Sequence, residues 1–299
     1  MTRPRLAITL GDPRGIGPEI VAAAIADLRV RARADLVVVG PSGTVVPASE
    51  EIGEWASGGS AEQGGRLAGL AIERAVKLAL AGEVQGIVTA PIDKHALFAG
   101  GYDFPGHTEM LAELTRSHVA MMLASDRLRV VLVTTHIALA NVPRELNRER
   151  IIECAEITRR GLQQLYGIGE PRIALCALNP HMGDGGRFGA EDDTLLAPAA
   201  RAAKILGPFP ADTVFVRAMR GEFDAVLAPY HDVGMTAIKV ASFGNAVNVT
   251  LGLPFPRTSP DHGTALDIAG QNRADPSSMI EAILECARFA EIRAAERSE

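Results

Sequence analysis

The chain has 299 residues, of which 47% are hydrophobic and 22% are charged, and its formal net charge is −6 at pH 7. This is the composition of a globular protein, and the length favours two domains. No stretch is strongly basic, which argues against nucleic-acid binding, and no apolar run approaches the roughly 20 residues of a membrane span. The N-terminal segment lacks the long apolar region of a secretory signal, so we expect a cytoplasmic protein.

Short β-branched runs alternate with segments of helical period along the whole chain. The predicted strands are 5–10, 34–40, 84–90, 128–135, 172–178, 223–229 and 245–252. The predicted helices are 17–28, 65–82, 148–167, 192–206 and 277–298. Most of the strands are apolar on successive residues, which predicts strands covered on both faces, so we expect an α/β architecture with mostly parallel sheets.

Two composition features fall outside this alternation. Segment 45–65 is rich in Gly, Ser and Glu, which predicts an exposed loop. Three widely spaced cysteines lie in apolar segments, and we interpret them as buried reduced thiols: Cys154, Cys176 and Cys286.

Three predicted strands are followed by a histidine. His136 follows strand 128–135, His181 follows strand 172–178, and His231 follows strand 223–229. In open α/β sheets, ligands bind beyond the carboxyl ends of the strands. Three imidazoles that meet there would leave open positions on a divalent metal, as in a catalytic site. The alternative is that each histidine is a polar strand end bonded to a neighbouring loop.

Other motifs each allow two interpretations. The turn "GDPRGIGPE" after the first strand is either a tight connection or an anion-binding helix N-terminus, and it lacks the GxGxxG fingerprint. Arg257 lies in a proline-bounded segment predicted to be a rigid loop, which suits a carboxylate or phosphate clamp. His107 and Thr108 precede a helix that Thr108 would cap, while Lys239 and Asn248 taken alone are typical of a solvated face or a cap.

Eight motifs occur in order between residue 5 and about residue 290: "GDPRGIGPE", "TAPIDK", "PGHTE", "TTH", "LNPHMGDGG", "GPFPADT", "YHDVG" and "NVTLGLPFPRTSPDHGTALDIAG". Together they resemble the 4-hydroxythreonine-4-phosphate dehydrogenase family of vitamin B6 biosynthesis. The segment "DHGTALDIAGQNRADP" is also similar to the nucleotide loop of isocitrate and isopropylmalate dehydrogenases.

The resemblance implies an isocitrate dehydrogenase-like homodimer in which each subunit has two α/β domains, 1–105 plus 256–299 and 106–255. The active site would lie in the interdomain cleft and be shared with the partner subunit. The metal ligands would be His136, His181 and His231. Substrate binding would fall to His107, Thr108, Lys239, Asn248 and Arg257. The catalytic candidates are Asp212, Asp232 and Lys239, of which the two acids are candidate proton acceptors or orienting groups for a histidine. NAD, or NADP, would bind at Gly263, Thr264, Ala265, Asp267 and Gly270.

The implied reaction is the metal-dependent oxidation and decarboxylation of 4-hydroxythreonine 4-phosphate. Zn²⁺ is the expected metal, with Mg²⁺, Mn²⁺ and Co²⁺ as alternatives. Two features depart from the family pattern: segment 40–65 is short, and Val233 stands where a glutamine is familiar. A dehydrogenase of threonate or erythronate 4-phosphate, or of a carboxylated cis-dihydrodiol, is therefore the nearest alternative. A three-histidine hydrolase and a paralogue that only binds metal or nucleotide are the others.

Overall fold

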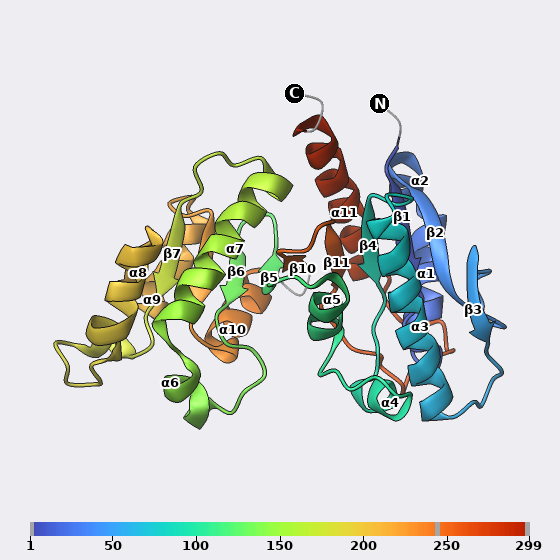
Figure 1. Cartoon of the computed structure of the whole chain (residues 1–299), viewed down its shortest axis with the longest axis horizontal. Helices are drawn as coiled ribbons and strands as arrows, with labels where there is room; N and C mark the ends of the chain where they lie inside the picture. Colours follow the sequence, from blue (N-terminus) through green and yellow to red (C-terminus); the bar gives the residue numbers. More distant parts are fainter. Residues whose placement is uncertain (1–2, 243–245, 297–299) are drawn as a thin grey trace. The chain divides into compact units, whose positions relative to one another are not determined.

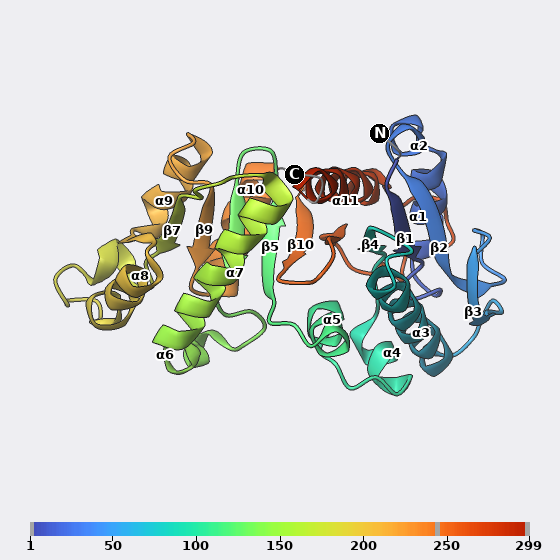
Figure 2. The same cartoon turned by 45° about the horizontal axis from the view of Figure 1, so that its top comes forward.

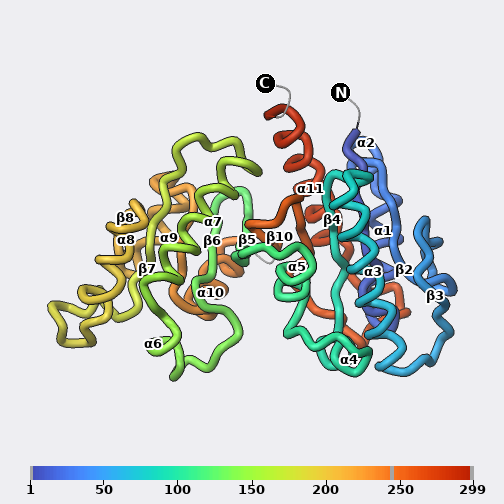
Figure 3. The backbone as a smooth tube through the Cα atoms, in the orientation of Figure 1, coloured from blue at the N-terminus to red at the C-terminus, as the bar shows by residue number. Residues whose placement is uncertain are grey.

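The computed structural model describes residues 3–242 and 246–296, which divide into two compact units. The first unit is formed by Met1–Ser117 together with Leu253–Glu299, and the second unit by His118–Gly252. Figure 3 traces how both ends of the chain build the first unit and the middle of the chain builds the second. The domain boundaries predicted at 105/106 and 255/256 stay predictions.

The first unit contains a sheet whose strand pairs are all parallel, in the order β3-β2-β1-β4-β11. Its strands are β1 (Arg5–Thr9), β2 (Asp35–Ser42), β3 (Glu50–Glu54), β4 (Gly86–Thr89) and β11 (Arg257–Pro260). In β1 the successive residues Leu6, Ala7 and Ile8 are all fully buried. A strand that is apolar on both faces needs cover on both faces, and this requirement explains the parallel α/β arrangement.

Helices cover this sheet. They are α1 (Gly17–Ala26), α2 (Leu28–Arg33), α3 (Ala61–Leu80), α4 (Lys94–Ala99), α5 (His107–Thr115) and α11 (Ser277–Glu296). The crossovers through α1 and through α3 run in opposite directions along the strand order, and right-handed connections then put these two helices on opposite faces (Figure 1). Helix α3 begins at Ser60, whose side chain accepts a hydrogen bond from the Gln63 amide at 3.1 Å.

The second unit contains a mixed sheet in the order β10-β5-β6-β9-β7-β8. Its strands are β5 (Ala120–Ala124), β6 (Arg129–Leu132), β7 (Ile173–Cys176), β8 (Leu206–Phe209), β9 (Ala225–Ala228) and β10 (Val247–Leu251). Strand β5 pairs antiparallel with β10 and with β6, whereas the β6–β9, β9–β7 and β7–β8 pairs are parallel. The three strands that are followed by the predicted histidines, β6, β9 and β7, therefore lie in the parallel part of the sheet.

The helical segments of the second unit are η1 (Leu139–Asn141), α6 (Val142–Glu145), α7 (Arg148–Tyr166), η2 (Pro180–Gly183), η3 (Asp192–Leu196, a π-helix), α8 (Ala197–Ala203), α9 (Ala211–Met219) and α10 (His231–Ser242). Helix α7 crosses the sheet on the side nearer the viewer in Figure 1, and Figure 2 shows it from a second direction. Apolar side chains of β6, β9, α9 and α10 form a common core, which includes Val130, Leu132, Val226, Phe215 and Ile238.

The structure corrects several predictions. The predicted loop 45–65 contains β3 and the start of α3, because β3 joins the edge of the sheet beside β2 despite its polar sequence. Arg257 does not lie in a loop: it is the first residue of β11, which pairs with β4. The helix expected after His107 and Thr108 is α5, whereas helices α9 and α10 and strands β5 and β8 were not predicted. Of the predicted elements, residues 245, 297 and 298 lie outside the described residues.

Two further predictions concern the chain as a whole. Cys154, Cys176 and Cys286 are buried and free, which confirms their interpretation as thiols. Within residues 3–242 and 246–296, no helix is both long enough and apolar enough to cross a membrane.

Candidate active site

Three neighbouring parallel strands of the second unit bring the predicted metal ligands to one edge of the sheet. Strand β9 lies between β6 and β7 and is parallel to both. Their carboxyl ends therefore point the same way: His136 follows β6, His231 is the first residue of α10 after β9, and His181 lies in η2 after β7. The sheet topology thus supports the reasoning from strand ends.

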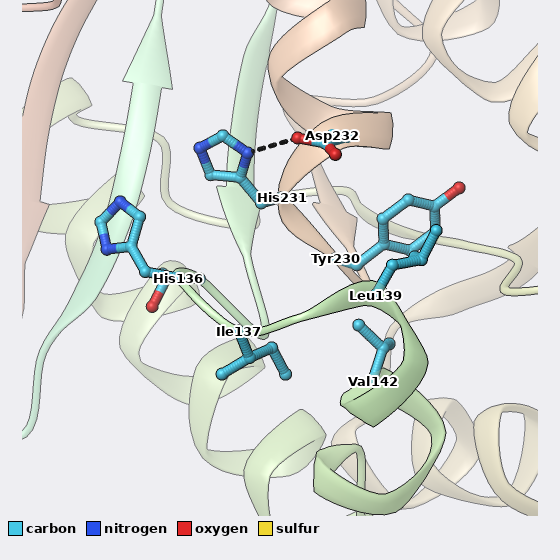
Figure 4. A pocket seen from close by; sticks show the side chains of 8 residues that line it. His136, Ile137, Leu139, Val142, Tyr230, His231 and Asp232 are labelled. Carbon is cyan, nitrogen blue, oxygen red and sulfur yellow. Dashed lines mark hydrogen bonds and ion pairs between the residues drawn. The ribbon is translucent and has the colours of Figure 1, made fainter.

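His136 and His231 lie next to each other in the lining of a pocket of the second unit. Their ring centroids are 5.6 Å apart, and the ring planes are inclined by 45°. The pocket is also lined by Tyr230 and Asp232 and by an apolar group on the segment from β6 to α6, namely Ile137, Leu139 and Val142. Figure 4 shows the two imidazoles on one side and the apolar side chains on the other.

Asp232 orients the His231 ring. The Asp232 carboxylate lies 2.7 Å from His231 Nδ1, and Figure 4 marks this contact. When Nδ1 carries the proton and donates it to the carboxylate, the lone pair of the ring lies on Nε2. A carboxylate that fixes the tautomer in this way is the usual support of a metal-binding histidine. His231 and its neighbour therefore fit a role in metal binding.

His181 is not among the residues that line this pocket. It lies exposed in η2, where His181 (φ 52°) and Met182 (φ 58°) both have left-handed backbone conformations. Across residues 3–242 and 246–296, no three or more His, Cys, Asp or Glu side chains form a group that could hold a metal. The structure thus brings two of the three predicted histidines together, and the three-histidine centre stays a prediction.

The base of the loop that carries His181 is held by Asp192. This carboxylate is 1% exposed and accepts hydrogen bonds from the amides of Leu178 at 2.8 Å and Asn179 at 3.0 Å. The Asn179 side chain in turn donates to Glu191 at 2.9 Å. Asp192 therefore fixes the backbone that precedes His181, and Glu191 holds the Asn179 side chain.

The other predicted residues of the second unit have different surroundings. Asn248 lies on β10, and its buried Oδ1 has no hydrogen-bond partner among the described residues. Lys239 is exposed on α10. Asp212 is exposed in the first turn of α9 and, unlike Asp232, does not line the pocket. Buried polar atoms are almost always satisfied, so the Asn248 carbonyl indicates a position for a ligand or water.

In the first unit, Arg257 is a buried cation. It is 1% exposed, and its Nη2 donates to the Thr89 hydroxyl at 2.5 Å. Burial lowers the pKa of Arg257 to about 10, and the attraction of Glu109 offsets this only in part. A guanidinium can hold a carboxylate or phosphate through its forked N–H groups, so a buried Arg257 fits a site for such an anion.

His107 is a neutral histidine beside this cation. Burial, together with the positive charges of Arg257 and Lys94, holds the pKa of His107 well below its ordinary value of 6.5. Its Nε2 is buried and has no hydrogen-bond partner in the described part of the chain. The predicted cap by Thr108 is wrong: Gly106 is the N-cap of α5, and no side chain accepts a cap hydrogen bond there.

The predicted cofactor residues form a loop after β11. Gly263 and Asp267 are exposed, Thr264 is buried, and Ala265 and Gly270 have positive φ values of 42° and 72°. Just before them, the ring of His262 has a buried Nε2 with no partner among the described residues. An exposed carboxylate can accept a hydrogen bond from a hydroxyl group, and the histidine nitrogen can bind another polar group, so the loop is compatible with the predicted dinucleotide site.

Sequence reasoning assigned no role to two residues near Arg257 and His107. Thr89 and Lys94 both belong to "TAPIDK", which begins with the last residue of β4 and runs to the start of α4, so the strand-end rule would have found them. Sequence reasoning also missed the apolar side chains that line the pocket of the second unit. Ile137, Leu139 and Val142 are ordinary core residues by type, and no local signal distinguishes them.

Known proteins are similar to this chain over nearly its whole length. The family model of the pyridoxal phosphate biosynthetic protein PdxA matches residues 19–286. A 4-hydroxythreonine-4-phosphate dehydrogenase from Geobacter metallireducens is 44% identical, covering 98% of this chain and 97% of the relative. A D-threonate 4-phosphate dehydrogenase from Cupriavidus necator is 41% identical, covering 97% and 98%.

Solved structures show the same likeness. A 4-hydroxythreonine-4-phosphate dehydrogenase from Klebsiella pneumoniae has a TM-score of 0.86 at 37% identity, covering 97% of this chain and 98% of that one. An isocitrate dehydrogenase from Methylococcus capsulatus has a TM-score of 0.51 at 15% identity, covering 99% and 89%, and at that identity it shows the fold alone. The predicted α/β fold of the isocitrate dehydrogenase type is confirmed.

Proposed function

This chain belongs to the PdxA family of pyridoxal phosphate biosynthetic proteins, and on that premise we propose that it oxidises 4-hydroxythreonine 4-phosphate at its secondary hydroxyl and releases CO₂. The observation that carries the proposal is the 44% identity, over 98% of this chain, to a 4-hydroxythreonine-4-phosphate dehydrogenase. The hydride acceptor is NAD, or NADP, held by the loop of Gly263, Thr264, Ala265, Asp267 and Gly270. The product enters pyridoxal phosphate biosynthesis.

We assign the binding site for the anionic group of the substrate to the first unit. Arg257 is a buried cation, and its charge helps to lower the pKa of His107, the first residue of α5, which Thr108 follows in the same turn. Neutral His107 can donate or accept a hydrogen bond without adding charge, while Arg257 supplies the charge. Lys239 and Asn248 are the other proposed substrate contacts. The unpartnered Oδ1 of Asn248 supports its role as an acceptor for a hydroxyl or amino group.

A divalent metal is part of the proposal, with Zn²⁺ first and Mg²⁺, Mn²⁺ or Co²⁺ as alternatives. A bound cation of this kind supplies a Lewis acid that lowers the pKa of a substrate hydroxyl. His136, His181 and His231 are the proposed ligands, and Asp232 holds the His231 ring in the tautomer that ligation needs. Asp212 and Asp232 are the candidate proton acceptors, and the position of Asp232 in the pocket lining favours it.

A second candidate substrate is D-threonate 4-phosphate. It is favoured by the 41% identity to the Cupriavidus necator enzyme, which is close to the identity of the first relative. Both compounds carry a phosphate and a hydroxy acid, so the anion site described above does not distinguish them. The resemblance further leads us to propose a cytoplasmic homodimer whose subunits share their active sites.

A substrate panel tests the function. NADH or NADPH formation is followed with 4-hydroxythreonine 4-phosphate, D-threonate and erythronate 4-phosphates and a carboxylated cis-dihydrodiol, before and after chelation. We expect turnover and CO₂ release with the first compound, loss of turnover on chelation, and recovery with Zn²⁺ or another divalent ion. The variant Arg257→Lys should raise KM for phosphorylated substrates, because an ammonium cannot make the planar, forked contacts of a guanidinium.

Three results would contradict parts of this proposal. Turnover of only the dihydrodiol would overturn the phosphorylated substrate. Phosphate release without reduced nicotinamide would indicate a hydrolase. Full turnover after chelation would remove the metal. Light scattering of the purified protein tests the dimer, and a monomer that is fully active would exclude a shared site.

A further inference from the structure

The first turn of α1 and the proposed cofactor loop are bonded directly to each other. The Ile16 amide donates to the Thr264 carbonyl at 2.9 Å. Six residues further along the loop, Glu19 Oε2 accepts the amides of Gly270 at 3.0 Å and Asn272 at 3.3 Å. One carboxylate on a helix thus holds the far end of the loop, while a backbone amide of the same turn holds its near end.

The loop has a conformation that needs such support. Ala265, Gly270 and Asn272 have positive φ values of 42°, 72° and 54°, a region that side chains other than glycine enter at a cost. A side chain at Gly15 would also be excluded, because its Cβ would lie 2.8 Å from the Thr264 carbonyl oxygen. Gly15 of "GDPRGIGPE" therefore permits the close approach of the two segments.

These contacts also favour one of the two interpretations of "GDPRGIGPE". An anion at the start of α1 would need open amides, but the Ile16 amide is already used by Thr264. The first turn also carries the negative charge of Glu19, which opposes a second anion. The contacts therefore favour the tight-connection interpretation, in which the motif supports the loop.

We propose that Glu19 is a positioning residue of the cofactor site, which holds residues 263–272 in the shape that binds the nicotinamide dinucleotide. The inference rests on the proposed cofactor role of this loop. Glu19 need not touch the cofactor, since it acts through the amides of Gly270 and Asn272. Its second oxygen, Oε1, is buried and has no hydrogen-bond partner among the described residues. A glutamine can therefore keep the accepting oxygen and put its amide group at the unpartnered position.

The test uses the full-length protein with the variants Glu19→Ala and Glu19→Gln. Glu62→Ala is the matched control, since Glu62 is an exposed acid in the first turn of α3. NADH and NADPH binding are measured by fluorescence titration, and hydrogen exchange of peptides covering 261–273 is measured without cofactor. We expect Glu19→Ala to weaken dinucleotide binding about tenfold, as the loss of two charge-assisted hydrogen bonds implies. Exchange at Gly270 and Asn272 should become faster.

The same variants separate positioning from general stability. Glu19→Gln should bind the dinucleotide within about threefold of the wild type, because the accepting oxygen remains. Glu19→Ala should change KM for the phosphorylated substrate by less than about twofold, and Glu62→Ala should change none of these quantities. Unchanged dinucleotide affinity in Glu19→Ala overturns the inference. An equal weakening of dinucleotide binding and of KM for the phosphorylated substrate also overturns it. If the wild type binds neither NADH nor NADPH, the proposed cofactor role itself fails, which is a separate outcome.

Discussion

His107 shows how single residues in this protein acquire properties that their type does not specify. Burial and two nearby cations keep its ring neutral in the folded state, where its pKa lies well below 6.5. The unfolded chain therefore takes up a proton near pH 6.5 that the folded chain does not bind. Protons then favour unfolding, and stability is lost as the pH falls from 6.5 toward the lower pKa of the folded state.

We expect this residue to cost about 1 kcal/mol of unfolding free energy between pH 6.5 and 5.5. The measurement is urea denaturation of the wild type and of His107→Gln at both pH values. The variant should lose less stability over this interval than the wild type. His95→Gln, which changes an exposed histidine on α4, is the control and should keep the wild-type slope. Equal slopes for all three proteins would show that His107 titrates normally.

At the scale of elements, the loop after β7 depends on one buried acid. Asp192 lies at the start of the π-helix η3 and accepts two amides from the residues that follow β7. Its removal in Asp192→Ala would leave two partly buried amides without a partner, which we expect to cost about 3 kcal/mol of unfolding free energy. Denaturant titration measures this cost.

The neighbouring residue supplies the comparison. Asp193 is exposed, and Asp193→Ala should change the unfolding free energy by no more than about 0.5 kcal/mol. Similar stability of the two variants would mean that the loop is held by other contacts. Asp192 would then not be needed to position the proposed ligand His181.

At the scale of the molecule, the two units have different chain connectivity. The second unit is one continuous segment with its own apolar core, whereas the first is built from both ends of the chain. A fragment of residues 118–252 should therefore unfold cooperatively in urea. A longer fragment of residues 106–255, cut at the predicted boundaries, carries α5, whose Met110 and Leu111 are fully buried in the first unit. This fragment should aggregate more, because it exposes these side chains.

Circular dichroism and light scattering distinguish the two fragments. A fragment of residues 118–252 without a cooperative transition would show that this unit does not fold alone. A monodisperse 106–255 fragment that is more stable than the shorter one would instead favour the predicted boundaries. The structure contains α5 in the first unit because it packs on α3, and no local pattern near residue 105 predicts that contact.

Much of the architecture could be predicted because strand and helix periods are local. Runs such as Leu6–Ala7–Ile8 are apolar on both faces, so they indicate covered parallel strands before any contact is known. The strand-end rule predicted that His136, His181 and His231 would meet, and the structure brings His136 and His231 together. The polar strand β3 was missed because pairing with β2 stabilises it more than its own residues do, and α10 was missed although it packs into the apolar core.

The chain alone thus determined the α/β class, the family and the residue types available for chemistry, because these depend on local pattern and on ordered motifs. Tertiary structure decided their environments: Arg257 became a buried strand residue, His107 a neutral one, and Glu19 the support of a distant loop. Burial, charge proximity and hydrogen-bond partners join residues far apart in the chain. No spacing in the sequence encodes them, so only the folded chain reveals them.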